Sequence, residues 1–118
     1  MKLFLAAAIV AACAALGLAA CSSNASCSAS VPTTCPSSAP SYAKDVAPLV
    51  QTYCGSCHAA GGQEADTPLT SYTELSARAS DVEGEVGSCD MPPSDEAQPT
   101  DAERALILDW IVCGAAND

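Results

Sequence analysis

The stretch Cys54-Gly55-Ser56-Cys57-His58 decides how the rest of the chain is interpreted. Its two thiols are three positions apart, close to one turn of an α-helix, so both can lie on one side of the backbone. An imidazole follows directly, and His58 is the only histidine among the 118 residues. The stretch can therefore hold a group by two covalent bonds while a ring nitrogen faces it.

The C-x-x-C-H pattern is the attachment signature of c-type haem. The sequence thus predicts one covalent haem c, bound through the thiols of Cys54 and Cys57, with His58 as an axial ligand of the iron. Aromatic residues make up only 4% of the chain. A large apolar cofactor would therefore also supply core volume that the side chains lack.

Three other interpretations of the cysteine pair stay open from the sequence alone. A thioredoxin-like redox site needs a βαβ context, and no strand pattern is visible. A zinc site could combine Cys54 and Cys57 with Cys89 and Cys113, but it would leave His58 unused. A plain Cys54–Cys57 disulfide is the third.

Met91 is the predicted second axial ligand. It stands in Cys89-Asp90-Met91-Pro92-Pro93, a polar and irregular stretch in which a methionine is poorly placed for packing. A second axial histidine is impossible within a chain that has one histidine. Met/His ligation raises the haem potential. With both axial positions filled, no substrate can reach the iron, so the sequence does not indicate an enzyme.

Residues 1–20 have the pattern of a secretory signal peptide, with Lys2 before a short apolar run that ends in small residues. The end of this segment, Leu18-Ala19-Ala20-Cys21, resembles the lipobox of bacterial lipoproteins. That resemblance implies lipidation of Cys21 and a membrane anchor. An ordinary signal with Cys21 in a disulfide is the alternative. We expect an exported protein on the periplasmic side of the outer membrane, with the cell surface also open.

The chain is strongly acidic, with a formal net charge of −10. Removing residues 1–20 takes away one of its four basic residues and none of its 14 acidic ones. Nucleic acid binding is not expected, because neutralising phosphates requires Lys and Arg. Such a surface suits redox partner proteins that are basic or neutral. We expect a monomer.

Residues 21–40 are rich in Ser, Pro and Ala and cannot bury enough apolar surface to fold alone. We interpret them as a tether that precedes a domain over residues 41–118. Within the domain, apolar spacing predicts three helices, at about 45–55, 72–80 and 101–114.

The helix ends carry their own signals. Asp45 is the expected N-cap of the first helix, because it puts Pro48 in the first turn. Capping boxes at Ser71-Tyr72-Thr73-Glu74 and Thr100-Asp101-Ala102-Glu103 begin the other two helices. Residues 59–70 and 84–100 hold glycines and prolines, so we expect them to be loops.

Four cysteines remain as disulfide candidates once lipid and haem are assigned: Cys27, Cys35, Cys89 and Cys113. We expect Cys27–Cys35 and Cys89–Cys113, because pairing within each segment needs no long excursion of the tether. The second bond would tie the Met91 loop to the last helix. Unpaired thiols, or pairs between the two segments, are the alternatives.

Over residues 41–115 the chain resembles the class I c-type cytochromes, in particular the single-haem domains of bacterial lipoproteins. The matching features are Asp45-Val46-Ala47-Pro48-Leu49 before the haem motif, then Met91-Pro92-Pro93, and the apolar run from Leu106 to Val112. The haem motif is specific, and the helix matches are weaker.

The resemblance implies an all-α, small cytochrome c-like fold of about three helices packed around one covalent haem. It implies that the first and last helices cross near the haem edge, which would bring Tyr53 close to Trp110. The expected function is that of a membrane-tethered electron carrier. Alternatives are a gas-binding sensor in which Met91 dissociates, or a structural metal-binding lipoprotein that uses its cysteines.

Overall fold

The computed structural model describes residues 27 and 29–118. The described part of the chain is helical and contains no strand, which confirms the all-α class. Its elements, in order, are η1 (Tyr42–Val46), α1 (Ala47–Tyr53), α2 (Gly55–His58), α3 (Tyr72–Ala77), α4 (Ala79–Ser88) and α5 (Asp101–Val112). The signal peptide predicted for residues 1–20 and the expected lipidation of Cys21 lie outside the described residues.

The first helix begins earlier than its sequence suggests. Ser41, and not Asp45, is the N-cap, and its hydroxyl accepts a hydrogen bond from the Lys44 amide. Asp45 instead reaches back and accepts the Ser41 amide at 2.8 Å. The opening turn η1 is a π-helical turn that leads directly into α1, where Pro48 lies in the first turn as expected. The expectation about Asp45 was wrong because the helical segment begins one turn earlier than Pro48 requires. Ser41 caps η1, which contains no proline, and Pro48 follows in the first turn of α1.

The two predicted capping boxes are both formed. The Ser71 hydroxyl accepts the Glu74 amide at 3.3 Å, while the Glu74 carboxylate accepts the Ser71 amide at 2.8 Å. Thr100 and Glu103 make the same reciprocal pair at 3.2 and 2.8 Å. The starts of α3 and α5 are therefore set by the local sequence.

Residues 84–88, predicted to be irregular, are the second half of α4. Gly84 and Gly87 are tolerated there, and Gly87 has a packing role. A Cβ atom at position 87 would lie 2.5 Å from the Val31 side chain, so the glycine lets the N-terminal segment approach α4. The helix ends at Ser88, and its C-cap Cys89 has a left-handed φ of 68°.

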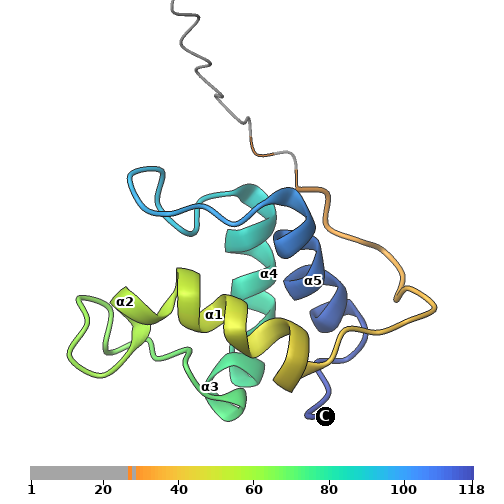
Figure 1. Ribbon diagram of the computed structural model, residues 1–118, viewed down its shortest axis with the longest axis horizontal. Helices are drawn as coiled ribbons and strands as arrows, with labels where there is room; N and C mark the ends of the chain where they lie inside the picture. The colour runs from red at the N-terminus through yellow and green to blue at the C-terminus, as the bar shows by residue number, and fades with distance from the viewer. Residues whose placement is uncertain (1–26, 28) are drawn as a thin grey trace, which may run out of the picture.

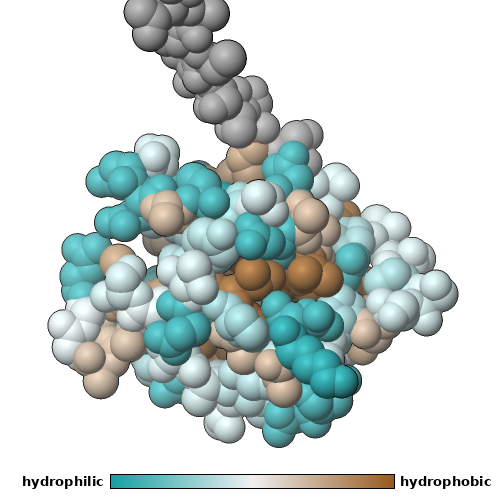
Figure 2. Space-filling model, viewed as in Figure 1, coloured by the Kyte–Doolittle hydropathy of each residue, from teal (hydrophilic) through white to brown (hydrophobic). Residues whose placement is uncertain are grey.

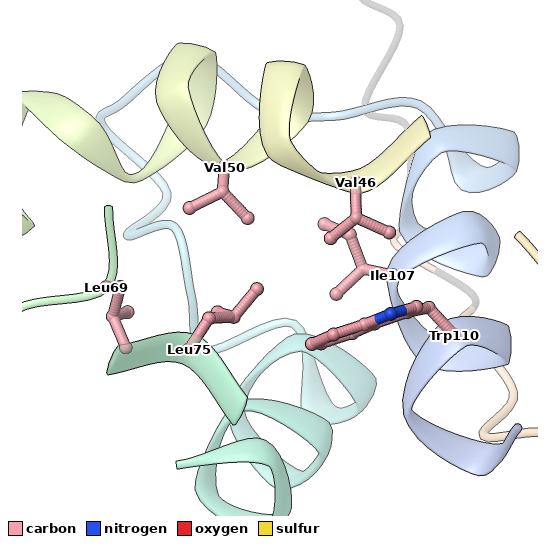
Figure 3. Packing of buried hydrophobic residues seen from close by; sticks show 6 residues of the cluster. All are labelled: Val46, Val50, Leu69, Leu75, Ile107 and Trp110. Atoms are coloured by element: carbon pink, nitrogen blue, oxygen red, sulfur yellow. The ribbon is translucent and has the colours of Figure 1, made fainter. Parts of the chain in front are cut away.

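Helices α4 and α5 lie side by side, and η1 with α1 crosses them (Figure 1). Six buried residues from η1, α1, α5 and the segment around α3 point toward one centre (Figure 3). They are Val46, Val50, Leu69, Leu75, Ile107 and Trp110.

The expectation that Tyr53 approaches Trp110 was wrong. The aromatic neighbours of Trp110 are Tyr42 and Tyr72, with ring centroids at 5.7 and 6.4 Å. Tyr53 lies one helix length further along and donates its hydroxyl hydrogen to Glu103 at 3.0 Å. The contact moves to Tyr42 because the helix begins at residue 42, so its first turn is the part that reaches the end of α5.

The predicted disulfide pairing was also wrong, although all four candidate cysteines are bonded. The bonds are Cys27–Cys89 and Cys35–Cys113, with Cα–Cα distances of 6.1 and 4.8 Å. Residues 29–41 run along the outer side of α5 before they enter η1 (Figure 1). The N-terminal segment therefore passes the ends of both α4 and α5, and pairing between segments needs no excursion.

Candidate functional site

A cavity of about 340 Å³ opens between α1, α2, α3, α4, α5 and the segment that joins α4 to α5. This lies in the size range of cofactor pockets, roughly 300–1,000 Å³. In Figure 2 hydrophobic residues gather in a recess near the middle of the visible face. The apolar lining includes Val50, Leu69, Leu75, Val82, Val86 and Ile107.

All four side chains predicted to hold the haem border this one cavity: Cys54, Cys57, His58 and Met91. Three of them come from the turn around α2, and Met91 comes from the segment after α4. The structure thus brings together residues that are 33 positions or more apart in the sequence.

The cysteine pair lies on a single turn. Cys54 joins α1 to α2, and its carbonyl accepts the amides of Cys57 and His58 at 3.2 and 2.9 Å. Both side chains are half-buried, and neither thiol is bonded to another cysteine. Burial raises the pKa of the Cys54 thiol to about 11, with the Arg104 charge acting against it and Cys57 adding to it.

The ring of His58 is oriented by a backbone carbonyl. Its Nδ1 atom lies 2.7 Å from the carbonyl oxygen of Thr67. A carbonyl oxygen can only accept, so Nδ1 carries the hydrogen and the lone pair is on Nε2. Metal-ligating histidines are usually held in this way, with the other ring nitrogen donating to a carbonyl or carboxylate.

The loop after α2 folds back over the motif and supplies that carbonyl. The Glu64 amide donates to Cys57 at 3.0 Å, and the Leu69 amide donates to His58 at 3.2 Å. At Gly62 the backbone passes so close that a Cβ atom would collide with the Cys57 carbonyl. The roles of Thr67 and Gly62 were missed from sequence, although the Gly61-Gly62 pair was a signal for close backbone approach.

Met91 lies just beyond the end of α4. Its amide donates to the Glu85 carbonyl at 3.1 Å, and its own carbonyl accepts from Arg104 at 2.8 Å. The side chain is 36% exposed at the border of the cavity. The backbone of this residue is therefore held, while the residue as a whole stays partly accessible at the border of the cavity.

Arg104 is a further residue that the sequence reasoning missed. It is 1% exposed, and it is the one buried polar or charged side chain recorded among residues 27 and 29–118. The signal was its register, because Arg104, Ile107 and Leu108 follow the i, i+3, i+4 spacing of a core-facing stripe.

The four-cysteine zinc site is wrong, because Cys89 and Cys113 are each bonded to another cysteine. Across residues 27 and 29–118, no three His, Cys, Asp or Glu side chains converge as metal ligands.

No helix in this same part of the chain is long and apolar enough to cross a membrane.

Comparisons of the chain with protein-family models, with curated proteins and with solved structures find no match.

Proposed function

We propose that the protein is an exported electron carrier with a single covalent haem c, tethered to the membrane through Cys21. The observation that carries this proposal is the convergence on one apolar cavity of two unbonded thiols, an imidazole and a thioether. The hydrogen bond from His58 to Thr67 leaves Nε2 as the free donor nitrogen, which is the state a metal ligand requires.

The donor set fits haem c. Cys54 and Cys57 lie on one turn that borders the cavity. They would hold the group by thioether bonds, each formed when an S–H adds across a vinyl group. His58 and Met91 would be the axial ligands. When bound, the haem supplies a reversible one-electron couple between Fe(II) and Fe(III). The mostly apolar lining, together with a Met ligand, would favour the reduced state.

Filling both axial positions with protein side chains favours electron transfer over catalysis, so we propose no enzymatic activity. The rim of the cavity is accessible, since Met91, Pro93 and Glu96 are exposed. With a net charge of −10, the chain suits a basic or neutral redox partner protein and not nucleic acid. We propose a monomer on the periplasmic side of the outer membrane, with the cell surface as the alternative.

One observation favours a second candidate, a haem-based gas sensor. The Met91 side chain is 36% exposed and belongs to a segment without helix, so it could leave the iron. Carbon monoxide added to the reduced protein separates the two functions. Rapid binding at neutral pH supports the sensor, and slow or absent binding supports the carrier.

The proposal is tested by expressing the whole chain, with its own N-terminal segment, in a host that matures c-type cytochromes. A sharp α-band on reduction, and haem that stays with the denatured polypeptide, are expected. The variant Cys54→Ser/Cys57→Ser should lose both, whereas Ser56→Ala, an exposed change in the same turn, should keep them. A chain without haem under these conditions would overturn the proposal.

A further inference from the structure

A buried guanidinium reaches the segment that carries Met91. From α5, the Nη1 atom of Arg104 donates to the Met91 carbonyl at 2.8 Å and to the Val86 carbonyl at 3.3 Å. Its Nη2 atom donates to the side-chain oxygen of Gln98 at 2.6 Å. All three acceptors are neutral, and the side chain is 1% exposed. Two backbone carbonyls and one side-chain amide thus accept the hydrogen bonds of the buried guanidinium.

Gln98 extends the same network along the segment. Its side-chain nitrogen donates to the carbonyls of Pro92, Pro93 and Glu96, at 3.1, 2.7 and 3.2 Å. We call residues 89–100 the ligand loop. The two side chains of Arg104 and Gln98 together hold the last turn of α4, Met91 itself and the loop that follows it.

Filling core volume does not explain an arginine at this position. Removing a guanidinium from water is costly, and an apolar side chain of similar size would fill the same space. What the arginine adds is a rigid fork with several donors, which can bind carbonyls in different directions at once. Two of its acceptors lie on either side of the α4 terminus, and the third is Gln98, which binds the rest of the ligand loop.

We infer that Arg104, acting with Gln98, is the positioning residue that keeps the Met91 thioether at the cavity. This rests on the proposed function, because it takes Met91 to be an axial ligand. Arg104 acts through the Met91 backbone and touches no cofactor atom. It restricts departure of the thioether, and so decides whether the site behaves as a closed carrier or as an open gas-binding site.

The test uses the haem-loaded whole chain and imidazole as the competing ligand of the ferric protein. Arg104→Lys keeps the charge but loses the fork, and Gln98→Ala, at an exposed residue, removes the bonds that Gln98 makes to the ligand loop and to Arg104. Both variants should bind imidazole more tightly, Arg104→Lys by about tenfold or more, the scale of a lost hydrogen bond to a charged group. The far-red Met–iron absorption should weaken in the same order.

The matched control is Lys44→Gln. This change also removes one positive charge, but Lys44 is exposed on η1, does not line the cavity, and its side chain forms no hydrogen bond with the ligand loop among the described residues. The imidazole affinity of this variant should be unchanged. A lower melting temperature in Arg104→Lys with unchanged imidazole affinity in both test variants would overturn the inference, because it would leave Arg104 a purely structural role.

A readout without haem separates this inference from the proposed function. Amide hydrogen exchange at Met91 and Glu96, whose amides donate to Glu85 and Pro93, should quicken in Gln98→Ala and stay constant in Lys44→Gln. If the chain binds no haem but exchange responds in this way, the proposed function fails and the restraint on the loop stands. If haem is bound and neither exchange nor imidazole affinity responds, the restraint fails alone.

Discussion

The two walls of the cavity are ordered by different kinds of contact. On the wall that carries the thiols and His58, the restraints come from nearby residues: Thr67 on the His58 ring, and Glu64 on the Cys57 carbonyl. The ligand loop also has local hydrogen bonds, through Glu85 and Gln98, but it is restrained in addition from distant parts of the chain, by the disulfide from Cys27 and by Arg104 of α5. The attachment wall is thus a local structure, whereas the ligand loop depends on the tertiary fold.

Because of this difference, we expect the two proposed axial positions to fail independently. A change near α2 should affect haem attachment and leave the ligand loop ordered. A change in the N-terminal segment or in α5 should affect Met91 and leave attachment intact. Substitutions on either wall can break this separation, and the largest effect is expected at the two proposed ligands themselves.

The two proposed ligands should give opposite phenotypes. His58→Ala should yield little or no mature haem protein, because the attachment wall loses its nitrogen ligand. Met91→Ala should keep the haem covalently bound, lose the far-red Met–iron band, and bind carbon monoxide rapidly when reduced. The measurement is haem per polypeptide together with the absorption spectrum. Equal loss of haem in both variants would contradict the independence of the two walls.

The two disulfides should contribute similarly to the stability of the protein and differently to the proposed ligation by Met91. Each closes a long stretch of chain, with separations of 62 and 78 residues, so removing either should lower the free energy of unfolding by about 2–4 kcal/mol. Only Cys27→Ser/Cys89→Ser should also weaken Met91 ligation, since Cys89 is two residues before it.

The pair Cys35→Ser/Cys113→Ser is the matched control for this prediction. It removes a bond at the end of α5 and leaves the ligand loop attached to Cys27. Denaturant unfolding gives the stability, and imidazole titration gives the ligation. Equal imidazole affinity in the two double variants would show that Cys27–Cys89 does not restrain the ligand loop.

A pair of glycines tests the attachment wall more gently. Gly62→Ala should destabilise the protein by about 1–3 kcal/mol, as overpacking does, because the new Cβ meets the Cys57 carbonyl. Gly84→Ala, in an open position of α4, should stabilise by about 0.5–1 kcal/mol. Thermal melts of the two variants measure this. A neutral Gly62→Ala would mean that the loop can move away from the motif without cost.

The smallest expected effect concerns Glu103, whose carboxylate joins the α5 cap to Tyr53. Hydrogen bonds from the Thr100 amide and hydroxyl, and then from Tyr53, hold the pKa of Glu103 below its usual range. A lowered folded-state pKa gives stability that is complete above the ordinary carboxylate range and is lost as the pH falls through the folded value. Acidification below about pH 4 should therefore lower the melting temperature less in Glu103→Gln than in the unchanged protein.

The control for the acid prediction is Glu74→Gln, which removes the carboxylate of the other capping box without touching Tyr53. Melting temperature is followed across the acid range in all three proteins. If both variants reduce the fall of melting temperature with acid by the same amount, the additional hydrogen bond from Tyr53 to Glu103 has no effect of its own.

Much of the helix pattern could be predicted, because its signals are local. The capping boxes at Ser71 and Thr100 each act within one turn, and both begin helices where expected. The start of the first helix could not be placed, since Asp45 and Ser41 both offer capping oxygens. Residues 84–88 were misjudged because a glycine weakens a helix by only about 1 kcal/mol, which packing against Val31 can offset.

The disulfide partners and the neighbours of Trp110 depended on the path of the chain. Spacing alone favoured Cys27–Cys35, since a short loop costs least entropy to close. That preference no longer holds once residues 29–41 lie along α5. The packed chain then brings Cys27 to Cys89 at the end of α4, and Cys35 to Cys113 at the end of α5. Arg104 was overlooked for a related reason: its acceptors are the backbone carbonyls of Val86 and Met91 and the side-chain oxygen of Gln98, and a sequence pattern does not display such contacts.

The sequence by itself determined the all-α class, the two capped helices and the grouping of Cys54, Cys57 and His58 on one turn. Only the tertiary structure decided that Met91 borders the same cavity, which cysteines pair, and that Arg104 and Gln98 restrain the ligand loop. The physical reason is the range of the contacts. Interactions within one helical turn follow from residue spacing, whereas those between distant segments exist only after packing has brought the segments together.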